Sequence, residues 1–319
     1  MKRKLSFRED GTFTVTQFTD VHWKDGGEPD QRSFALMESV LDAEHPDLVV
    51  FTGDIIYTGT VAPGETECRD PAQAFRDAVS AVEARGIPWA AVFGNHDTEN
   101  RISRDELMDV ILEHRHTVTE RGRSGLPGTG NYRLTVLDQE GTPAASLYFF
   151  DTGEMCPFPG VKGYDWLKHD QVAWYMEDSR TLSQAFHGRP VPSLAFFHIP
   201  LPEYKEVWNL GGCSGSKNEE VCCSTVNAGM FGAMLERGTM LGTFAGHDHI
   251  NDYCGDLHGI KLCYGRATGY NTYGQEGFPR GARMIRLHAG ALSFDTWVRL
   301  DDGRVISYMD EGAADSILS

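Results

Sequence analysis

Short apolar runs, separated by helical segments and ending in similar polar residues, constrain the fold of this chain most. Residues 12–20 ("TFTVTQFTD") are rich in Thr, Val and Phe and alternate, which predicts a strand. Residues 47–54 and 87–97 are apolar runs that end in turn residues, as buried strands do. Apolar residues at helical spacing over 33–45 and 71–86 predict a helix between successive strands. This order predicts a parallel sheet covered by helices.

The rest of the sequence continues this alternation and then changes to strands. Ser103 followed by Glu106 is a capping box, which marks the start of a helix. Helices are predicted over 103–115, 168–184 and 224–238, a hairpin over 131–138 and 145–153, strands over 192–200 and 239–249, and antiparallel strands over 259–270, 282–301 and 303–310. No repeat or linker interrupts the 319 residues, so we expect one domain spanning 1–319.

The charge balance argues against two classes of partner. The formal net charge is −17, which disfavours binding to nucleic-acid backbones or anionic membranes. The first residues, "MKRKLSFREDGTFTV", are basic but lack the apolar region of a signal peptide. No run approaches the roughly 18 apolar residues of a membrane span. We therefore expect a cytoplasmic protein without a membrane span.

The seven cysteines lack the paired spacing of a zinc ribbon. Disulfides are rare in cytosolic proteins, so the expected cytoplasmic location predicts reduced thiols. A small loop closed by Cys213 with Cys222 or Cys223 is the alternative.

Metal-binding residue types follow five of the predicted strands. A lone histidine after a strand is more often an ordinary hydrogen-bonded residue, and "GNHD" alone suits a turn. However, ligands bind at the carboxyl ends of strands in α/β sheets, so five such ends point to one site. The residues are Asp20 and His22, then Asp54, then Asn95, His96 and Asp97, then His198, and finally His247 and His249.

The order DxH, GD, GNHD, H and GHxH resembles the calcineurin-like metallophosphoesterase family, and all five blocks match here. The resemblance implies an α/β fold: a four-layer α-β-β-α sandwich of two mixed β-sheets flanked by helices. It also implies two divalent or mixed-valence transition-metal ions (Mn, Fe or Zn) bridged by one aspartate. The donor types fit these metals and lack the thiolates of closed structural zinc sites.

The resemblance also implies a role for each ligand. Asp20, His22 and His249 resemble the ligands of the first metal; Asn95, His198 and His247 resemble those of the second; Asp54 resembles the bridging aspartate. Residues two apart at a strand end face the same way, so His247 and His249 can each serve one metal. Asp248 then points elsewhere, as a loop carboxylate outside the metal site.

The implied activity is hydrolysis of phosphate monoesters by direct attack of a metal-bound hydroxide. His96 matches the family histidine near the leaving group, for transition-state stabilisation or general-acid catalysis, with Asp97 orienting it. A turn carboxylate is the alternative for Asp97. Tyr57 fits the GDxxY motif of purple acid phosphatases, but His22 occupies the corresponding coordination position. We therefore expect Tyr57 to be a packed aromatic residue.

Later segments, including "FFHIPLPEY" and "FAGHDHINDYCG", resemble the branch of plant purple-acid-phosphatase-like proteins and related fungal phosphatases. Arg266 is predicted to contact the substrate phosphate, because a guanidinium matches phosphate geometry; a salt bridge is the alternative. Tyr270 and Tyr273 could stack on an aromatic leaving group or pack in the core. Further pocket candidates are Glu203, Tyr204, Cys222, Cys223, Asn227, Asn251 and Asp252.

Other functions stay open at this point. A phosphodiesterase acting on cyclic nucleotides or phospholipid headgroups would use the same metal core, because substrate choice depends on the loops. A non-catalytic metal-binding scaffold is the alternative of another class. The expected partner is a phosphorylated small molecule or protein.

Overall fold

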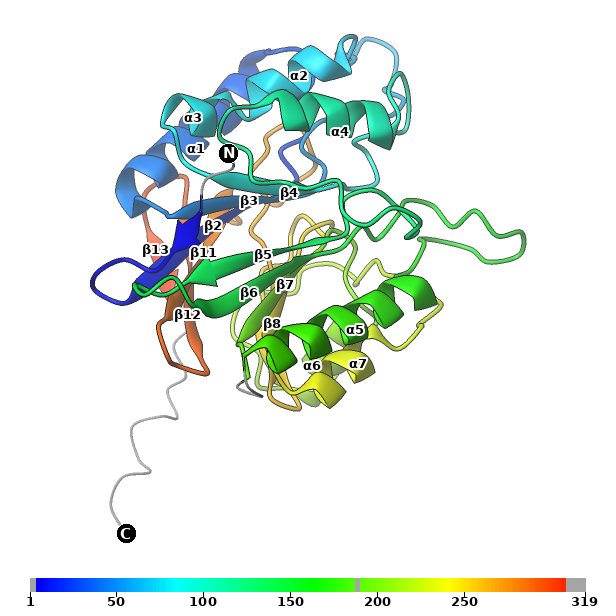
Figure 1. The fold of residues 1–319 in the computed structure, drawn as a ribbon. Helices are drawn as coiled ribbons and strands as arrows, with labels where there is room; N and C mark the ends of the chain where they lie inside the picture. Colours follow the sequence, from blue (N-terminus) through cyan, green and yellow to red (C-terminus); the bar gives the residue numbers. More distant parts are fainter. Residues whose placement is uncertain (1–3, 187–189, 308–319) are drawn as a thin grey trace.

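The computed structural model describes residues 4–186 and 190–307. They form two mixed β-sheets packed face to face between two layers of helices, so the expected sandwich is confirmed (Figure 1). Sheet I has the strand order β13 (Val305–Ser307), β12 (Phe294–Leu300), β11 (Gly281–His288), β2 (Thr12–Phe18), β3 (Leu48–Thr52) and β4 (Trp89–Val92). Sheet II has the order β1 (Leu5–Ser6), β5 (Tyr132–Leu137), β6 (Pro143–Phe149), β7 (Ser193–Phe196), β8 (Met240–Ala245), β10 (Ile260–Tyr264) and β9 (Cys254–Leu257).

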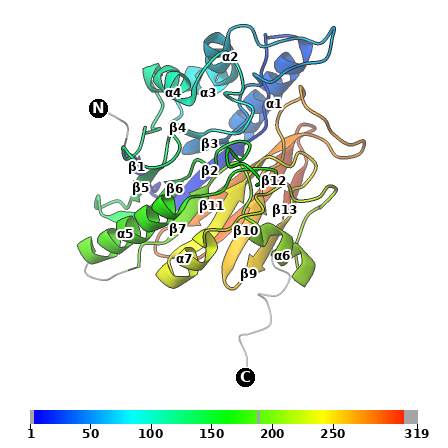
Figure 2. The same cartoon turned by 90° about the vertical axis from the view of Figure 1, so that its right-hand side faces the viewer.

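The helices divide between the outer faces of the two sheets (Figures 1 and 2). Sheet I is covered by α1 (Glu28–Glu44), α2 (Pro71–Ala78), α3 (Ser80–Ala84) and α4 (Arg104–Glu113). Sheet II is covered by α5 (His169–Ala185), α6 (Glu203–Leu210) and α7 (Met230–Arg237). Among the described residues, no helix combines the length and the apolar character that crossing a membrane requires.

Two predicted helices differ from the structure, and one helix was not predicted. The single helix predicted over 71–86 is interrupted at Val79, which separates α2 from α3. The helix predicted over 224–238 begins only at Met230, because Gly229 before it has a left-handed backbone (φ 85°). Helix α6 was not predicted: its eight residues follow two prolines and show too short an apolar pattern.

Parallel pairing sets the position of the strand ends. β2, β3 and β4 are parallel neighbours in sheet I, as predicted. In sheet II, β6, β7, β8 and β10 are parallel to one another. The residues after β2, β3 and β4 therefore leave one edge of sheet I together, and those after β7 and β8 leave one edge of sheet II.

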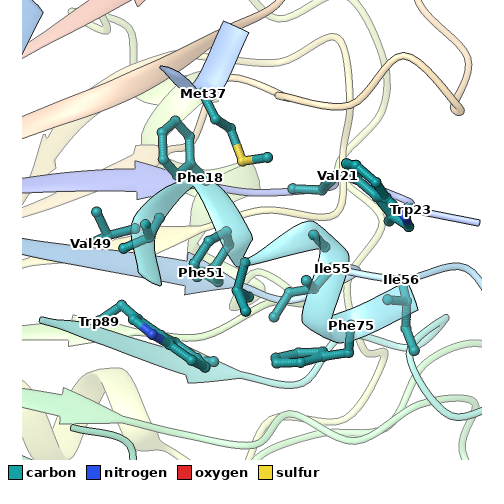
Figure 3. Close-up of a cluster of buried hydrophobic side chains, with 14 of the residues drawn as sticks. Phe18, Val21, Trp23, Met37, Val49, Phe51, Ile55, Ile56, Phe75 and Trp89 are labelled. Atoms are coloured by element: carbon teal, nitrogen blue, oxygen red, sulfur yellow. The ribbon is translucent and has the colours of Figure 1, made fainter. Parts of the chain in front are cut away.

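Three apolar layers hold these sheets and helices in place. Phe51 and Trp89 belong to the layer between sheet I and its helices (Figure 3). Val15 and Phe196 belong to the layer between the two sheets. Buried polar side chains also cross between the sheets: Gln17 on β2 donates to the carbonyl of Ala245 on β8 (3.1 Å), and Tyr132 on β5 donates to the carbonyl of Ala91 on β4 (2.8 Å). The two edges that carry the polar residues are thus fixed relative to each other.

The expectation that all cysteines are reduced thiols is wrong. Cys254 and Cys263 are directly paired across the antiparallel strands β9 and β10 and form a disulfide. Cys213, Cys222 and Cys223 are free, so the alternative small loop is not closed either. Disulfides are rare in cytosolic proteins, so this bond does not support the expected cytoplasmic location.

The predicted capping box at the start of α4 is present. The Ser103 hydroxyl accepts the backbone N–H of Glu106 (3.3 Å), and the Glu106 carboxylate accepts the backbone N–H of Ser103 (2.8 Å). We predict that Ser103→Ala lowers the free energy of unfolding by about 1 kcal/mol, because helix N–H groups lose their partner. Urea denaturation measures this change. Ser103→Thr is the control, since it keeps the cap; equal stability of Ser103→Ala and the wild type would contradict the prediction.

Candidate metal centre

The carboxyl ends of five strands bring the predicted ligands together where the two sheets meet. The described part of the chain contains two groups of donor atoms, and within each group all the atoms lie within 4.8 Å of one another. The first group is Asp20, His22, Asp54 and His249, and the second is Asp54, His198 and His247. All these residues are buried. The division is the one that the family resemblance implies, and Asp54 is the residue that both groups share.

The Asp54 carboxylate lies at the centre of the cluster. Its Oδ2 atom is 3.4 Å from His22 Nε2 and 3.2 Å from His198 Nε2. Among the described residues, neither Asp54 Oδ2 nor His22 Nε2 has a hydrogen-bond partner, although both atoms are buried. Leaving buried polar atoms unpaired is costly, and metal coordination would satisfy both. The donor set of carboxylate, amide and imidazole groups therefore fits a pair of transition-metal ions.

The other predicted ligands complete the two groups. His249 Nε2 lies 3.3 Å from Asp20 Oδ1. Asn95 Oδ1 lies 3.2 Å from His198 Nε2, and His247 Nδ1 lies 3.3 Å from the same nitrogen. The structure thus brings together all seven residues that the sequence singled out as metal ligands.

Strained backbone aims several of these side chains. Asp20, His22, Asp54 and His247 have φ values of 53°, 52°, 49° and 78°, in the left-handed region that residues other than glycine rarely adopt. Hydrogen bonds hold this geometry: the Asp20 carboxylate accepts the N–H of His247 (3.1 Å), and Asp54 Oδ1 accepts the N–H of His96 (2.8 Å). Such strain is characteristic of functional sites.

Asp97 does not have the predicted role beside His96. Its buried carboxylate accepts backbone N–H groups from Gly94 (2.7 Å), Asp54 (3.0 Å) and Ile56 (2.9 Å). It therefore joins the ends of β3 and β4, which carry Asp54 and Asn95. Glu99, which the sequence analysis did not identify, contacts His96 instead, with Oε2 2.9 Å from Nδ1.

The charges of the cluster favour a bound cation. Burial opposes ionisation of Asp54, but the His198 charge outweighs it and holds the pKa of Asp54 well below its usual value. Burial lowers the pKa of His22 to about 4, and burial together with the His198 charge lowers that of His247 to about 3. Burial also opposes the charged form of His198, yet Asp54 raises its pKa to about 9. These shifts favour the protonated form of His198 and the neutral forms of His22 and His247, which are the forms that can coordinate a metal.

Three tyrosines lie beside the cluster. Tyr57 and Tyr273 were named in the sequence analysis without a metal-site role, and Tyr164 was not predicted. The Tyr57 ring stacks on His22 at 5.4 Å between centroids, and its hydroxyl donates to the carbonyl of Thr60 (3.3 Å). This contact agrees with its expected role as a packed aromatic residue. Tyr164 meets His247 edge-on at 4.4 Å. Tyr273 stacks on His249 at 4.2 Å.

A loop outside the cluster positions His249. Thr272 Oγ1 lies 2.5 Å from His249 Nδ1, on the side of the ring away from Asp20. Arg280 holds this loop by donating to the carbonyls of Thr272 (2.9 Å) and Tyr273 (2.7 Å). Such partners fix the ring orientation of a metal-binding histidine.

The contacts of Arg266 and Tyr270 do not support their predicted roles. Arg266 is 2% exposed; its Nη1 donates to Asp252 (2.6 Å) and its Nε to the carbonyl of Pro279 (2.7 Å), so the ion-pair alternative describes it, in buried form. The Tyr270 hydroxyl donates to Asp301, and the Arg32 guanidinium carbon lies 3.9 Å from the centre of the Tyr270 ring. Tyr270 therefore packs beside the core rather than against the histidines of the site.

The remaining pocket candidates mainly support loops. Asp248 points away from the cluster, as predicted, and accepts the Tyr264 hydroxyl (2.6 Å) and the N–H of Cys222 (3.2 Å). Tyr204 is fully buried, and its hydroxyl lies 2.9 Å from Thr243 Oγ1. Three more candidates form hydrogen bonds: Asn227 donates to Glu203, Asn251 accepts the N–H of Asn218, and Asp252 accepts the N–H of Ser216. Burial raises the pKa of the Cys223 thiol.

Comparison with known proteins identifies the family. The family model for calcineurin-like phosphoesterases matches residues 13–251, which contain all seven clustered residues. The chain therefore belongs to the calcineurin-like phosphoesterase family.

Its relatives include plant and fungal proteins, as the later segments suggested. "Probable inactive purple acid phosphatase 29" from Arabidopsis thaliana is 33% identical over 94% of this chain and 85% of its own length. "Phosphatase DCR2" from Saccharomyces cerevisiae is 31% identical over 94% of this chain and 55% of its own length. A dimetal phosphatase from Danio rerio shares the fold, with a TM-score of 0.57 and 15% identity over 93% of this chain and 99% of its own.

Close approach of the strand ends requires a glycine beside the shared aspartate. A Cβ atom on Gly94 would lie 2.1 Å from Asp54 Oδ1 and 2.3 Å from the Asp54 nitrogen. We predict that Gly94→Ala displaces Asp54 and lowers the manganese content per chain after reconstitution, measured by elemental analysis. Gly232→Ala in α7 is the matched control, because nothing lies within 4 Å of its added Cβ. Equal manganese content in Gly94→Ala and the control would refute this.

Proposed function

We propose that this chain is a dinuclear-metal phosphoesterase that hydrolyses phosphate monoesters. The observation that carries the proposal is the Asp54 carboxylate, shared by two groups of donors, with one oxygen buried and unpartnered. Asp20, His22 and His249 would hold one ion, Asn95, His198 and His247 the other, and Asp54 both. We also propose that residues 1–319 form one domain around this site.

The bound ions would supply positive charge for the phosphoryl oxygens and lower the pKa of water. The chain's own residues would provide the rest. His96 lies beside the cluster, with its backbone N–H bound to Asp54 and its Nδ1 bound to Glu99. The Glu99 carboxylate thus orients the ring, and His96 Nε2 would give a proton to the leaving oxygen.

The plant relatives carry the word "inactive" in their names, so activity must be measured directly. The first test compares an aryl phosphate monoester with the matching diester, using manganese-reconstituted protein and a chelated control. We expect metal-dependent hydrolysis with a preference for the monoester. Preference for the diester would replace this proposal by a phosphodiesterase. No hydrolysis by protein that binds no metal would favour a non-catalytic protein that only keeps the fold.

We predict that Asp54→Asn abolishes both metal retention and turnover, because it removes the negative charge that both groups share. Metal content and hydrolysis of the aryl monoester are measured on the same sample. Asp301→Asn is the matched control, because it makes the same change at a carboxylate that accepts the Tyr270 hydroxyl and belongs to neither donor group. Normal metal content and rate in Asp54→Asn would overturn the bridging assignment.

A second prediction separates catalysis from metal binding. His96→Ala should lower kcat by about 100-fold or more, the usual contribution of general-acid catalysis, with unchanged metal content. Glu99→Gln should lower kcat less, by about tenfold, because the ring keeps a weaker partner. Loss of metal in His96→Ala would make it a ligand instead, and full activity in Glu99→Gln would remove Glu99 from the mechanism.

A further inference from the structure

Tyr57, Tyr164 and Tyr273, which we call the aromatic collar, border the metal centre on different sides. Tyr273 and Tyr57 stack on His249 and His22 of the first donor group. Tyr164 lies against His247 of the second group. Tyr57 is also 4.8 Å from the ring of His96, where the leaving group would depart. A substrate whose phosphate reaches the cluster would therefore place its organic group among these rings.

The collar is held in position before any ligand binds. The Tyr273 hydroxyl donates to Glu219 (2.7 Å), and its carbonyl accepts Arg280 (2.7 Å). Tyr164 is bridged to Met155 in the loop between β6 and α5, the green segment that projects from the body in Figure 1. Tyr273 is still 53% exposed, although one face of its ring covers His249. A ligand can therefore stack on it without rearrangement, which limits the entropy cost of binding.

Charges of both signs border the collar, because Lys24 Nζ lies 5.0 Å from the centre of the Tyr57 ring. Glu99 and Glu219 lie at the rim, bound to His96 and Tyr273. The guanidinium of Arg266 is engaged by Asp252, and that of Arg104 by Asp151 and Glu154. The exposed face of Tyr273, rather than these arginines, is thus available to recognise the organic group.

We propose that the aromatic collar is a binding site for a planar aromatic leaving group, so that the substrates are monoesters of aromatic alcohols. This inference rests on the proposed function. In the reaction, a water oxygen bonds to phosphorus as the bond from phosphorus to the ester oxygen breaks. The departing oxygen takes a proton and leaves as the alcohol. Free aryl-bearing phosphates and phosphorylated tyrosine in peptides share this chemistry.

The test compares benzyl phosphate with cyclohexylmethyl phosphate, using the manganese-reconstituted full chain. Both are esters of primary alcohols of similar shape, and only benzyl has a flat aromatic ring. We expect kcat/KM to be about fivefold higher for the benzyl ester, the scale of one aromatic contact. Tyr273→Leu should bring the ratio close to one, whereas Tyr273→Phe should keep it, because both lose the bond to Glu219 but only Phe keeps a ring.

Binding of the non-hydrolysable benzylphosphonate and cyclohexylmethylphosphonate, measured by calorimetry, separates the collar from catalysis. Preferential binding of benzylphosphonate without hydrolysis of either ester would support the collar and refute the proposed function. Hydrolysis of both esters at the same rate, or a ratio unchanged in Tyr273→Leu, would overturn the collar. Faster hydrolysis of a phosphotyrosine peptide than of free phosphotyrosine, which has the same leaving group, would assign the peptide as the source of the ring.

Discussion

The buried carboxylate of Asp54 is the interaction on which the site depends. A buried charge is costly unless it is paired, and here Asp54, after a strand of sheet I, is paired with His198, after a strand of sheet II. The two sheets must therefore meet at a fixed distance. Gln17 and the apolar layer between the sheets maintain that distance. The core thus positions the ligands as well as stabilising the fold.

The polar residues just outside the donor groups have a different task. Asp97 accepts three backbone N–H groups and joins the ends of β3 and β4. Thr272 orients His249, and Arg280 holds the loop that carries Thr272. These contacts keep the donor atoms within a small volume even though their backbones are strained. Preorganisation of this kind is what a metal centre requires from the protein.

The sequence predicted which polar residues would lie together, because each follows an apolar run and parallel pairing then brings the strand ends to one edge. It predicted their neighbours poorly. Arg266 was assigned to substrate because nothing local reveals its buried partner Asp252. Glu99 and Tyr164 lie on loops with no periodic pattern, so only the folded chain places them beside His96 and His247. The disulfide likewise depends on the register of β9 and β10.

The cost of this arrangement argues against a purely structural role. Four residues of the cluster have left-handed backbones, each at a cost of about 1–3 kcal/mol. Glycine would relieve that strain, and apolar residues would remove the unpaired buried atoms of Asp54 and His22. A scaffold needs neither the strain nor the buried charge, whereas a metal centre needs both to aim its donors. The strained backbones and the unpartnered buried atoms occur in the same cluster, a combination that favours a bound metal there.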